Sequence, residues 1–190
     1  MKKLICLTAI LITQCVNAQP TFYAEQYNTA KTVIDEAATE NGINPNLMLA
    51  IAITESGRGV GGGTNLVTPW PLAINTPSKS YYPLTYKEAH ETLTKAIEEY
   101  GDSVDVGMFQ VNLYYHGHNV NSPYDLLDIR TNTYVAAGIL KTALKSSKTP
   151  TIAVGRYHHW ADTARAQDYG TKTLKLAQVL SESNGVLASE

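Results

Sequence analysis

One helix without a polar face constrains the fold of this chain more than any other segment. Residues 47–53 read Leu-Met-Leu-Ala-Ile-Ala-Ile, and a helix that is apolar all round has to be surrounded by protein. Asn44 is a good N-cap and Pro45 suits the first helical position, so we expect the helix to begin there. Gly57 is expected to end it in the left-handed conformation. The rest of the chain should pack around this segment.

A single carboxylate, Glu55, falls in the last turn of this helix. The negative end of the helix dipole disfavours the charged form of an acid there by about 0.3–1 kcal/mol. Burial would act in the same direction, so Glu55 is expected to be able to hold a proton near neutrality. For an isolated glutamate, a solvated helix end without function is the simpler interpretation, and other residues have to decide.

The N-terminus has the pattern of a secretory signal peptide. Lys2 and Lys3 precede an apolar run over residues 4–13, and Val16-Asn17-Ala18 has small residues at the cleavage positions. We expect a leader over residues 1–18, cleaved after Ala18, and one domain over residues 19–190 with a flexible tail at 181–190. The apolar run is too short to span a bilayer as a helix. The sequence thus predicts an exported protein without stable membrane insertion.

Loss of this leader would change the chemistry of the chain. Both cysteines, Cys6 and Cys15, lie inside it, so the mature chain would have no disulfide or thiolate chemistry. Acylation of Cys15 is a minor alternative, because Gln14 stands where a small residue is expected. The net charge is −2 and becomes more negative without Lys2 and Lys3, which argues against nucleic-acid binding.

The remaining pattern is mostly helical. Apolar spacing predicts helices over about 21–40, 85–100, 125 or 128 to 144, 151–157 and 163–180. Thr85 and Glu88 form a capping-box pattern, and Gly101 follows the helix that they begin. Residues 58–83 are rich in glycine and proline, which predicts a loop or a short hairpin region. Residues 103–112 suggest a turn at Gly107 that enters a buried element, and residues 114–118 read as a loop.

Three blocks in this order resemble the soluble lytic transglycosylase domain, which has a lysozyme-like, goose-type fold. They are Glu55-Ser56, Asp-Val-Gly-Met-Phe-Gln-Val-Asn at 105–112 and Ala-Val-Gly-Arg-Tyr-His at 153–158. Residues 70–75, the capped helix before Ser103 and Tyr115-His116 are similar, more narrowly, to the small transglycosylases of conjugation and type IV secretion systems. The resemblance covers nearly the whole mature chain. It implies a mainly α, lysozyme-like single domain with a Gly/Pro-rich loop or short hairpin region.

The resemblance also implies an activity. Members cleave the β-1,4 bond between N-acetylmuramic acid and N-acetylglucosamine in periplasmic peptidoglycan and form a 1,6-anhydro ring without adding water. They need no cofactor, and their single catalytic glutamate, acid first and then base, maps onto Glu55. Hydrolytic glycosidases generally use two carboxylates, and no convincing second acid stands near this motif. Partners implied are glycan strands and proteins of a secretion, conjugation or pilus apparatus.

Five further residues map onto the family's substrate-binding or supporting positions. Ser56 resembles a serine that orients the catalytic carboxylate, and Gln110 resembles the glutamine that lines the sugar cleft. Tyr157 matches a tyrosine within reach of the catalytic glutamate, and Tyr169 matches a later family tyrosine. His158 stands where many members have asparagine, and because it titrates, activity is expected to fall at acid pH. For each of the first four, a purely structural role stays open.

Trp70 and Asp105 each have two open interpretations. Trp70 lies between two prolines and would either stack on a sugar or fill the core. Asp105 and its neighbour Asp102 are the remaining acids near the motif. Asp105 is expected to cap or hydrogen-bond the backbone beside the turn at Gly107. If it lay across the cleft from Glu55, ordinary hydrolysis would become the better interpretation.

The histidines do not predict a metal site. His116-Gly-His118 and His158-His159 are clustered, but they lack thiolate neighbours and the His-x-x-x-His spacing of a helical metal site. We therefore expect no metal.

Two competing functions stay open. One is a muramidase that uses water, and the other is a non-catalytic peptidoglycan-binding scaffold of a secretion system. The joint presence of Glu55, Gln110 and Tyr157 argues against the scaffold. A Glu55→Gln protein that rescued every cellular phenotype would support it.

Overall fold

The computed structural model describes the backbone of residues 18–59 and 67–187, and side-chain exposure for 27–59 and 67–183. The expected leader at 1–18 lies, apart from Ala18, outside the described residues, as does the glycine triplet at 61–63. In the described ranges, no helix has both the length and the apolar character needed to cross a membrane. The chain is mainly helical with short strands, which confirms the expected mainly α class.

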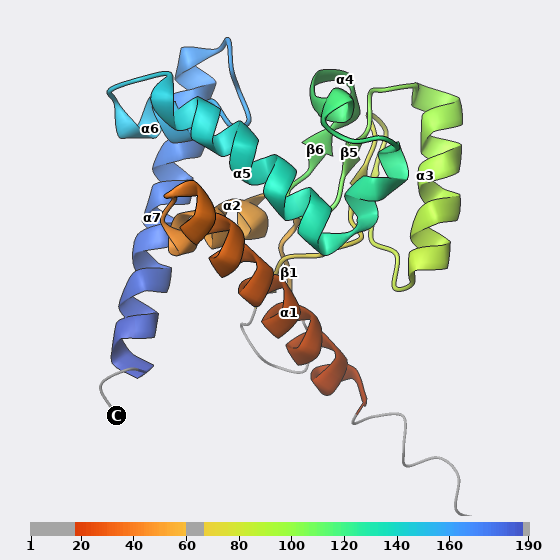
Figure 1. Ribbon diagram of the computed structural model, residues 1–190, viewed down its shortest axis with the longest axis horizontal. Helices are drawn as coiled ribbons and strands as arrows, with labels where there is room; N and C mark the ends of the chain where they lie inside the picture. The colour runs from red at the N-terminus through yellow and green to blue at the C-terminus, as the bar shows by residue number, and fades with distance from the viewer. Residues whose placement is uncertain (1–17, 60–66, 188–190) are drawn as a thin grey trace, which may run out of the picture.

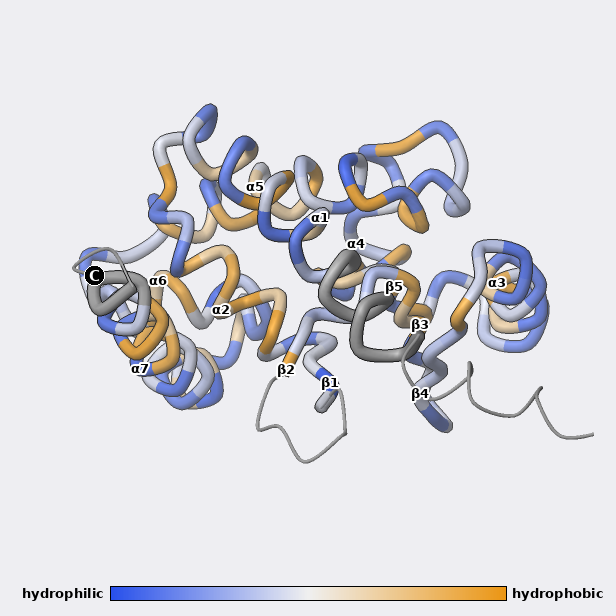
Figure 2. The backbone as a smooth tube through the Cα atoms, turned by 90° about the horizontal axis from the view of Figure 1, so that it is seen from below, coloured by the Kyte–Doolittle hydropathy of each residue, from blue (hydrophilic) through white to orange (hydrophobic). Residues whose placement is uncertain are grey.

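The apolar helix α2 (Pro45–Ser56) lies at the centre of a group of helices. The group comprises α1 (Ala18–Asn41), α5 (Ile129–Lys145), α6 (Pro150–Gly155) and α7 (Thr163–Leu187). Helix α2 packs against α1 and α7, α6 packs along α7, and α1 packs along α5 (Figure 1). Figure 2 shows α2 as a mostly hydrophobic segment inside this group. Residues 47–52 are all buried, so the expectation of a core helix is confirmed.

The two ends of α2 follow different rules. At its start, the Asn44 side chain accepts hydrogen bonds from the backbone N–H groups of Asn46 and Leu47, at 2.8 and 3.3 Å, as its N-cap role predicts. At its end, the expectation for Gly57 was wrong, because Gly57 has φ −59° and ψ 129° and is not left-handed. A Cβ at Gly57 would lie 2.3 Å from the carbonyl oxygen of Ile53. Gly57 is needed for this close approach.

A small sheet stands opposite the helices. Strands β3 (Ile74–Asn75), β4 (Ser80–Tyr81), β5 (Asp105–Val106) and β6 (Val111–Asn112) are antiparallel in the order β4-β3-β5-β6. Strands β1 (Arg58–Gly59) and β2 (Val67–Thr68) form a separate antiparallel pair. Short hairpins were expected over 58–83, and the pairs β1–β2 and β3–β4 confirm them. Helix α3 (Tyr86–Tyr100) flanks the sheet in Figure 1.

Helix α3 has the ends that the sequence predicts. The Thr85 hydroxyl accepts a hydrogen bond from the backbone N–H of Glu88 at 3.2 Å. The Glu88 carboxylate reaches back to the backbone N–H of Leu84, at 3.0 Å, one residue before the N-cap. Gly101 ends the helix at φ 58°.

Two expectations about secondary structure were wrong. The expected loop at 114–118 is helical, with α4 (Leu113–His116) followed by the 3-10 turn η1 (Gly117–Asn119). The Asn112 side chain starts α4 by accepting a hydrogen bond from the N–H of Tyr115 at 3.2 Å. A second 3-10 turn, η2 (Pro123–Leu127), precedes α5. The last helix, expected to end at about residue 180, continues as α7 to Leu187.

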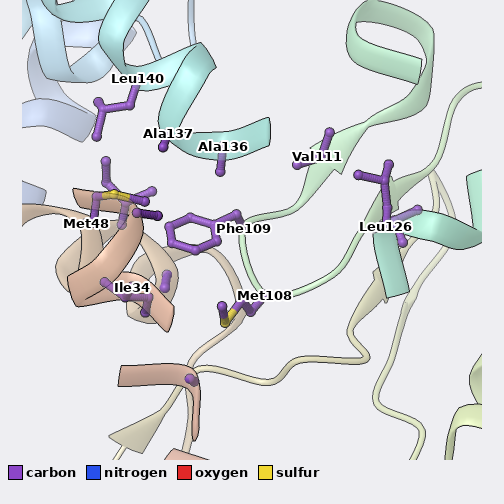
Figure 3. Packing of buried hydrophobic residues seen from close by; sticks show 14 of the residues in the cluster. Ile34, Met48, Met108, Phe109, Val111, Leu126, Ala136, Ala137 and Leu140 are labelled. Atoms are coloured by element: carbon purple, nitrogen blue, oxygen red, sulfur yellow. The ribbon is translucent and has the colours of Figure 1, made fainter. Parts of the chain in front are cut away.

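The aromatic ring of Phe109 joins the hairpin to the helices. Phe109 is 1% exposed, and its ring points from the β5–β6 turn into the space between Met48 of α2 and Ala136 and Ala137 of α5 (Figure 3). Burial of a phenylalanine side chain contributes about 1.5–3 kcal/mol. This anchor fixes the hairpin beside the end of α2, where Glu55 lies.

Candidate active site

An open groove lies between the end of α2 and the four-stranded sheet. Three adjoining pockets of about 540, 240 and 240 Å³ form it. Glu55 lines the two smaller pockets, and Asp105 lines all three. The walls carry mostly hydroxyl, amide and aromatic groups, from Asn75, Ser80, Tyr81, Tyr82, Gln110, Asn112 and Tyr115. Pockets for compact ligands are predominantly apolar, so this groove is better suited to an extended polar ligand.

The Glu55 carboxyl group lies at the floor of this groove. Its side chain is 7% exposed, because α2 ends in the middle of the fold. The Tyr169 hydroxyl of α7 donates a hydrogen bond to Glu55 Oε1 at 2.5 Å. His158 Nδ1 lies 3.4 Å from the same oxygen. Both groups approach Oε1, which leaves Oε2 as the oxygen that can exchange a proton with a ligand.

Tyr169 and His158 form a stacked pair beside Glu55. Their rings are 5.1 Å apart between centroids and 4° from parallel. Tyr169 is buried, and burial followed by the Glu55 charge raises the pKa of its hydroxyl, so Tyr169 stays a hydrogen-bond donor. The hydrogen bond to Glu55 raises the pKa of His158 above its ordinary 6.5, against the opposing effect of burial. Protonated His158 therefore stabilises the carboxylate form of Glu55.

Tyr157 has a different partner from the one its position implied. Its hydroxyl donates to the backbone carbonyl of Phe109 at 2.8 Å, so it fastens the hairpin to the segment after α6. Burial is the main cause of the raised pKa of Tyr157, and the charges of Glu55 and Asp105 add to it. The hydroxyl that contacts the candidate acid thus belongs to Tyr169.

Gln110 lines the groove in a backbone conformation that is rare for a residue with a side chain. Its φ is 48°, in the left-handed region. Its amide nitrogen donates to the carbonyls of Gly107, at 2.7 Å, and Ala73, at 3.3 Å. The side-chain nitrogen therefore has its hydrogen-bond partners inside the protein, as expected if Gln110 has a structural role. Gln110 still contributes to the surface of both smaller pockets, where its amide oxygen is an acceptor.

The buried side chain of Asn132 holds this turn in place, a role that the sequence did not reveal. It is 1% exposed, accepts a hydrogen bond from the N–H of Phe109 at 3.0 Å and donates to the carbonyl of Val106 at 2.8 Å. Gly107, at φ 81°, packs so tightly that a Cβ there would lie 2.2 Å from Asn132 Nδ2. The sequence offered two signals for this role. One is a glycine before a groove residue, and the other is an asparagine on an apolar helix face.

Ser56 and Trp70 support the site from inside the protein. Ser56 is 2% exposed, and its hydroxyl lies 2.8 Å from the carbonyl of Met108 and accepts from the N–H of Trp70 at 3.0 Å. Trp70 is 7% exposed, and its indole N–H donates to the carbonyl of Pro83 at 2.9 Å. These contacts agree with a structural role for both residues. The burial of Trp70 favours a place in the core over stacking on a sugar.

Asp105 belongs to the groove. It faces the same pockets as Glu55 from the sheet side, and its Oδ1 accepts from the side-chain amide of Asn112 at 2.8 Å. The expectation of a backbone partner was therefore wrong in its details. Burial is the main cause of the raised pKa of Asp105, and the charge of Glu55 adds to it. Asp105 therefore lies across the groove from Glu55, where hydrolysis would need a second carboxylate. Its raised pKa, however, favours the neutral form of Asp105.

The histidines are distributed around the groove. His116 and His158 line one of the smaller pockets, and His159 packs against His158 with ring centroids 4.5 Å apart. Within residues 27–59 and 67–183, no three side chains of the metal-binding types are grouped so that they could hold a metal ion.

Comparisons with protein-family models, with curated proteins and with solved structures found no significant match to this chain. A functional assignment therefore has to rest on the groove and on the residues that line it.

Proposed function

We propose that this chain is a peptidoglycan lytic transglycosylase with a lysozyme-like fold, which cleaves the β-1,4 bond between N-acetylmuramic acid and N-acetylglucosamine and leaves a 1,6-anhydro product. The observation that carries the proposal is Glu55, which is nearly buried at the floor of an open polar groove and contacted through one oxygen. The resemblance of three sequence blocks to the transglycosylase domain supplies the reaction type.

In this reaction Glu55 acts twice. Protonated Glu55 first donates its proton to the glycosidic oxygen, so that the bond to the leaving sugar breaks. The resulting carboxylate then accepts the proton of the C6 hydroxyl group, and the C6 oxygen bonds to C1 of the same sugar. The proton is returned to Glu55, no water is consumed and no second carboxylate is needed.

The neighbours of Glu55 fit the second half of this cycle. Once Glu55 has lost its proton, the hydrogen bond from Tyr169 and the nearby His158 stabilise the negative charge on Oε1. These contacts strengthen as charge develops on Glu55, which lowers the barrier to the first proton transfer. Gln110 and Asn75 offer amide groups at the groove surface, and these suit the acetamido and hydroxyl groups of amino sugars.

The first experiment is mass spectrometry of the fragments released from purified peptidoglycan by residues 19–190. We expect products one water lighter than hydrolytic ones. Replacement Glu55→Gln should lower their rate of release by about 10²–10⁴-fold, the range for loss of a general acid–base group. Glu98→Gln, which removes an exposed carboxylate on α3, is the matched control and should change nothing. Release of the light products at the wild-type rate by the Glu55→Gln variant would refute the proposal.

A hydrolytic muramidase is the second candidate, because Asp105 lines the same pockets as Glu55. Hydrolysis would need ionised Asp105 to activate water or to attack C1. Its burial, its hydrogen bond from Asn112 and its raised pKa favour a neutral, engaged group instead. Asp105→Asn separates the two candidates: a transglycosylase retains cleavage with light products, whereas a muramidase gives hydrated products that disappear in this variant.

For the cellular setting, we propose export to the periplasm and local opening of the wall during assembly of a secretion, conjugation or pilus apparatus. The leader pattern at residues 1–18 and the resemblance to transglycosylases of such systems support this setting. Fusion of residues 1–18 to a reporter that is active only after export tests the first part. A strain that carries Glu55→Gln at the native locus of the gene tests the second, since assembly should fail although the protein is present.

A further inference from the structure

Two cations are held against neighbouring tyrosine rings at the edge of the groove. The guanidinium carbon of Arg58 lies 4.3 Å from the ring centroid of Tyr82. The Lys79 ammonium nitrogen lies 4.6 Å from the ring centroid of Tyr81. Both tyrosines line the pocket that contains Glu55. A positive charge therefore lies against the ring of each of two consecutive aromatic residues of this wall.

The backbone holds both cations near fixed positions. Arg58 directly follows Gly57 and pairs with Thr68 in the β1–β2 hairpin. Lys79 lies in the β3–β4 turn, where its N–H and carbonyl are both bonded to Thr76. These segments are tied to the end of α2 and to the sheet, so the two charges are carried by the same framework as the groove.

Neither cation is neutralised by a carboxylate in the described part of the chain. The ion pairs there, within 4.0 Å, involve other basic residues. An aromatic face attracts a cation without using up its N–H donors, and a guanidinium can offer several donors to one carboxylate. Arg58 and Lys79 are therefore pre-positioned cations that can still bind an anion.

We propose that Arg58 and Lys79 form an anion-binding rim that takes the carboxylates of the short peptides attached to the glycan, here called stem peptides. This inference rests on the proposed function. The alternating sugars are uncharged where a peptide is attached through the lactyl group, so the anionic groups of the polymer lie on the stems. Arg58 and Lys79 lie against tyrosines that line the pocket containing Glu55, so they would attract such groups beside the groove. The rim makes strands that carry stem peptides the preferred substrate.

The test compares glycan strands that differ only in their stems. Fluorescently end-labelled strands of one length are prepared with stem peptides and after their removal by an amidase, and the lactyl carboxylates that the amidase frees are then converted to neutral methylamides. Binding is measured by anisotropy in a Glu55→Gln background, which keeps the strands intact. Arg58→Gln and Lys79→Gln should each weaken binding of the stem-bearing strands by about threefold, and together by about tenfold, the range for exposed ion pairs. Binding of the stem-free strands should not change.

Two controls make the test specific. Lys87→Gln removes a lysine of α3 whose side chain is 87% exposed and which lines none of the three pockets, and it should bind like the parent. Raising the salt concentration should remove the preference for stem-bearing strands, because exposed charges are screened. A double variant that binds stem-bearing strands as tightly as the parent, or that loses affinity equally for both strands, would overturn the rim.

The proposal of the rim and the proposal of the reaction can be refuted independently of each other. Binding in the Glu55→Gln background reports on Arg58 and Lys79 without any chemistry, whereas the masses of released fragments report on the reaction. A stem preference that depends on Arg58 and Lys79, with no light products from the wild type, would keep the rim and reject the transglycosylase. Light products without a stem preference would do the reverse.

Discussion

The two walls of the groove are built in different ways. The helical wall, which carries Glu55 at the end of α2, rests on the buried run 47–52 and on contacts with α1 and α7. The hairpin wall, which carries Asp105 and Gln110, is a tight turn with two positive-φ residues, fixed by the buried amide of Asn132 and the ring of Phe109. The helical wall spreads its stability over many apolar contacts, whereas the hairpin wall concentrates it in the hydrogen bonds of one amide and in one buried ring.

This difference has consequences for mutation. Loss of one methylene group in the helical wall removes a small part of a distributed energy, about 1 kcal/mol. Loss of the Asn132 amide leaves a buried N–H and a buried carbonyl without partners, at about 1–3 kcal/mol each. The hairpin wall should therefore fail at single positions, and the helical wall should degrade gradually.

The largest effect is expected for Asn132→Ala. The N–H of Phe109 and the carbonyl of Val106 both lose their partner, so the free energy of unfolding should fall by about 2–6 kcal/mol. Denaturant unfolding of residues 19–190 measures it. Asn28→Ala, at an exposed position of α1, is the matched control and should stay within about 0.5 kcal/mol of the wild type.

Gly107→Ala sharpens this prediction through a double-mutant cycle. A Cβ at Gly107 would collide with the Asn132 side chain at 2.2 Å, so part of the cost of Gly107→Ala should disappear once Asn132 is alanine. We expect a coupling of about 1–3 kcal/mol, the size found for residues in contact. Strictly additive losses would mean that Asn132 does not clamp the turn, and the contrast between the walls would not hold.

The sequence predicts the helical wall well because its signals are local. Asn44 and Thr85 lie directly before the helices that they cap, and the run 47–53 announces burial by its composition alone. The helical turn at 113–119 was missed, since Asn112 as a cap has no apolar periodicity behind it. The extension of α7 was missed because its sequence after 180 is polar, although contacts four residues apart, such as Gln178 to Glu182, support it.

The hairpin wall and the partners of Glu55 depend on contacts between distant residues. Tyr169 and Glu55 are 114 positions apart in the chain, and Asn132 and Phe109 are 23 apart. No helical or strand period links such pairs. The sequence could identify Glu55, Gln110, Tyr157 and Tyr169 as candidates through the resemblance. It could not tell which of the two tyrosines contacts the acid.

The next prediction compares these two tyrosines. Tyr169→Phe removes the hydrogen bond to Glu55 within the helical wall, and because this bond reaches a group that becomes charged, kcat should fall by about 10- to 100-fold. Tyr157→Phe removes a bond between the walls, to the carbonyl of Phe109, and should mainly cost about 1 kcal/mol of unfolding free energy. Steady-state release of fragments and thermal unfolding measure both variants. A larger kcat loss for Tyr157→Phe would reverse the two assignments.

The smallest effect concerns His158, whose charge faces Glu55 of the helical wall and Asp105 of the hairpin wall. Its pKa is raised above 6.5, chiefly by the hydrogen bond to Glu55, so imidazolium forms as the pH falls through a value above 6.5. The new positive charge stabilises the negative charge on Glu55 and so makes this carboxylate a weaker base toward the C6 hydroxyl group in the second half of the reaction. Wild-type kcat should therefore decline by about threefold on the acid side, a small effect because the His158 side chain is 47% exposed. In His158→Asn this decline should be absent while the alkaline limb is retained. An unchanged acid limb in the variant would assign the titration to Asp105, and the charge that governs Glu55 would then come from the hairpin wall.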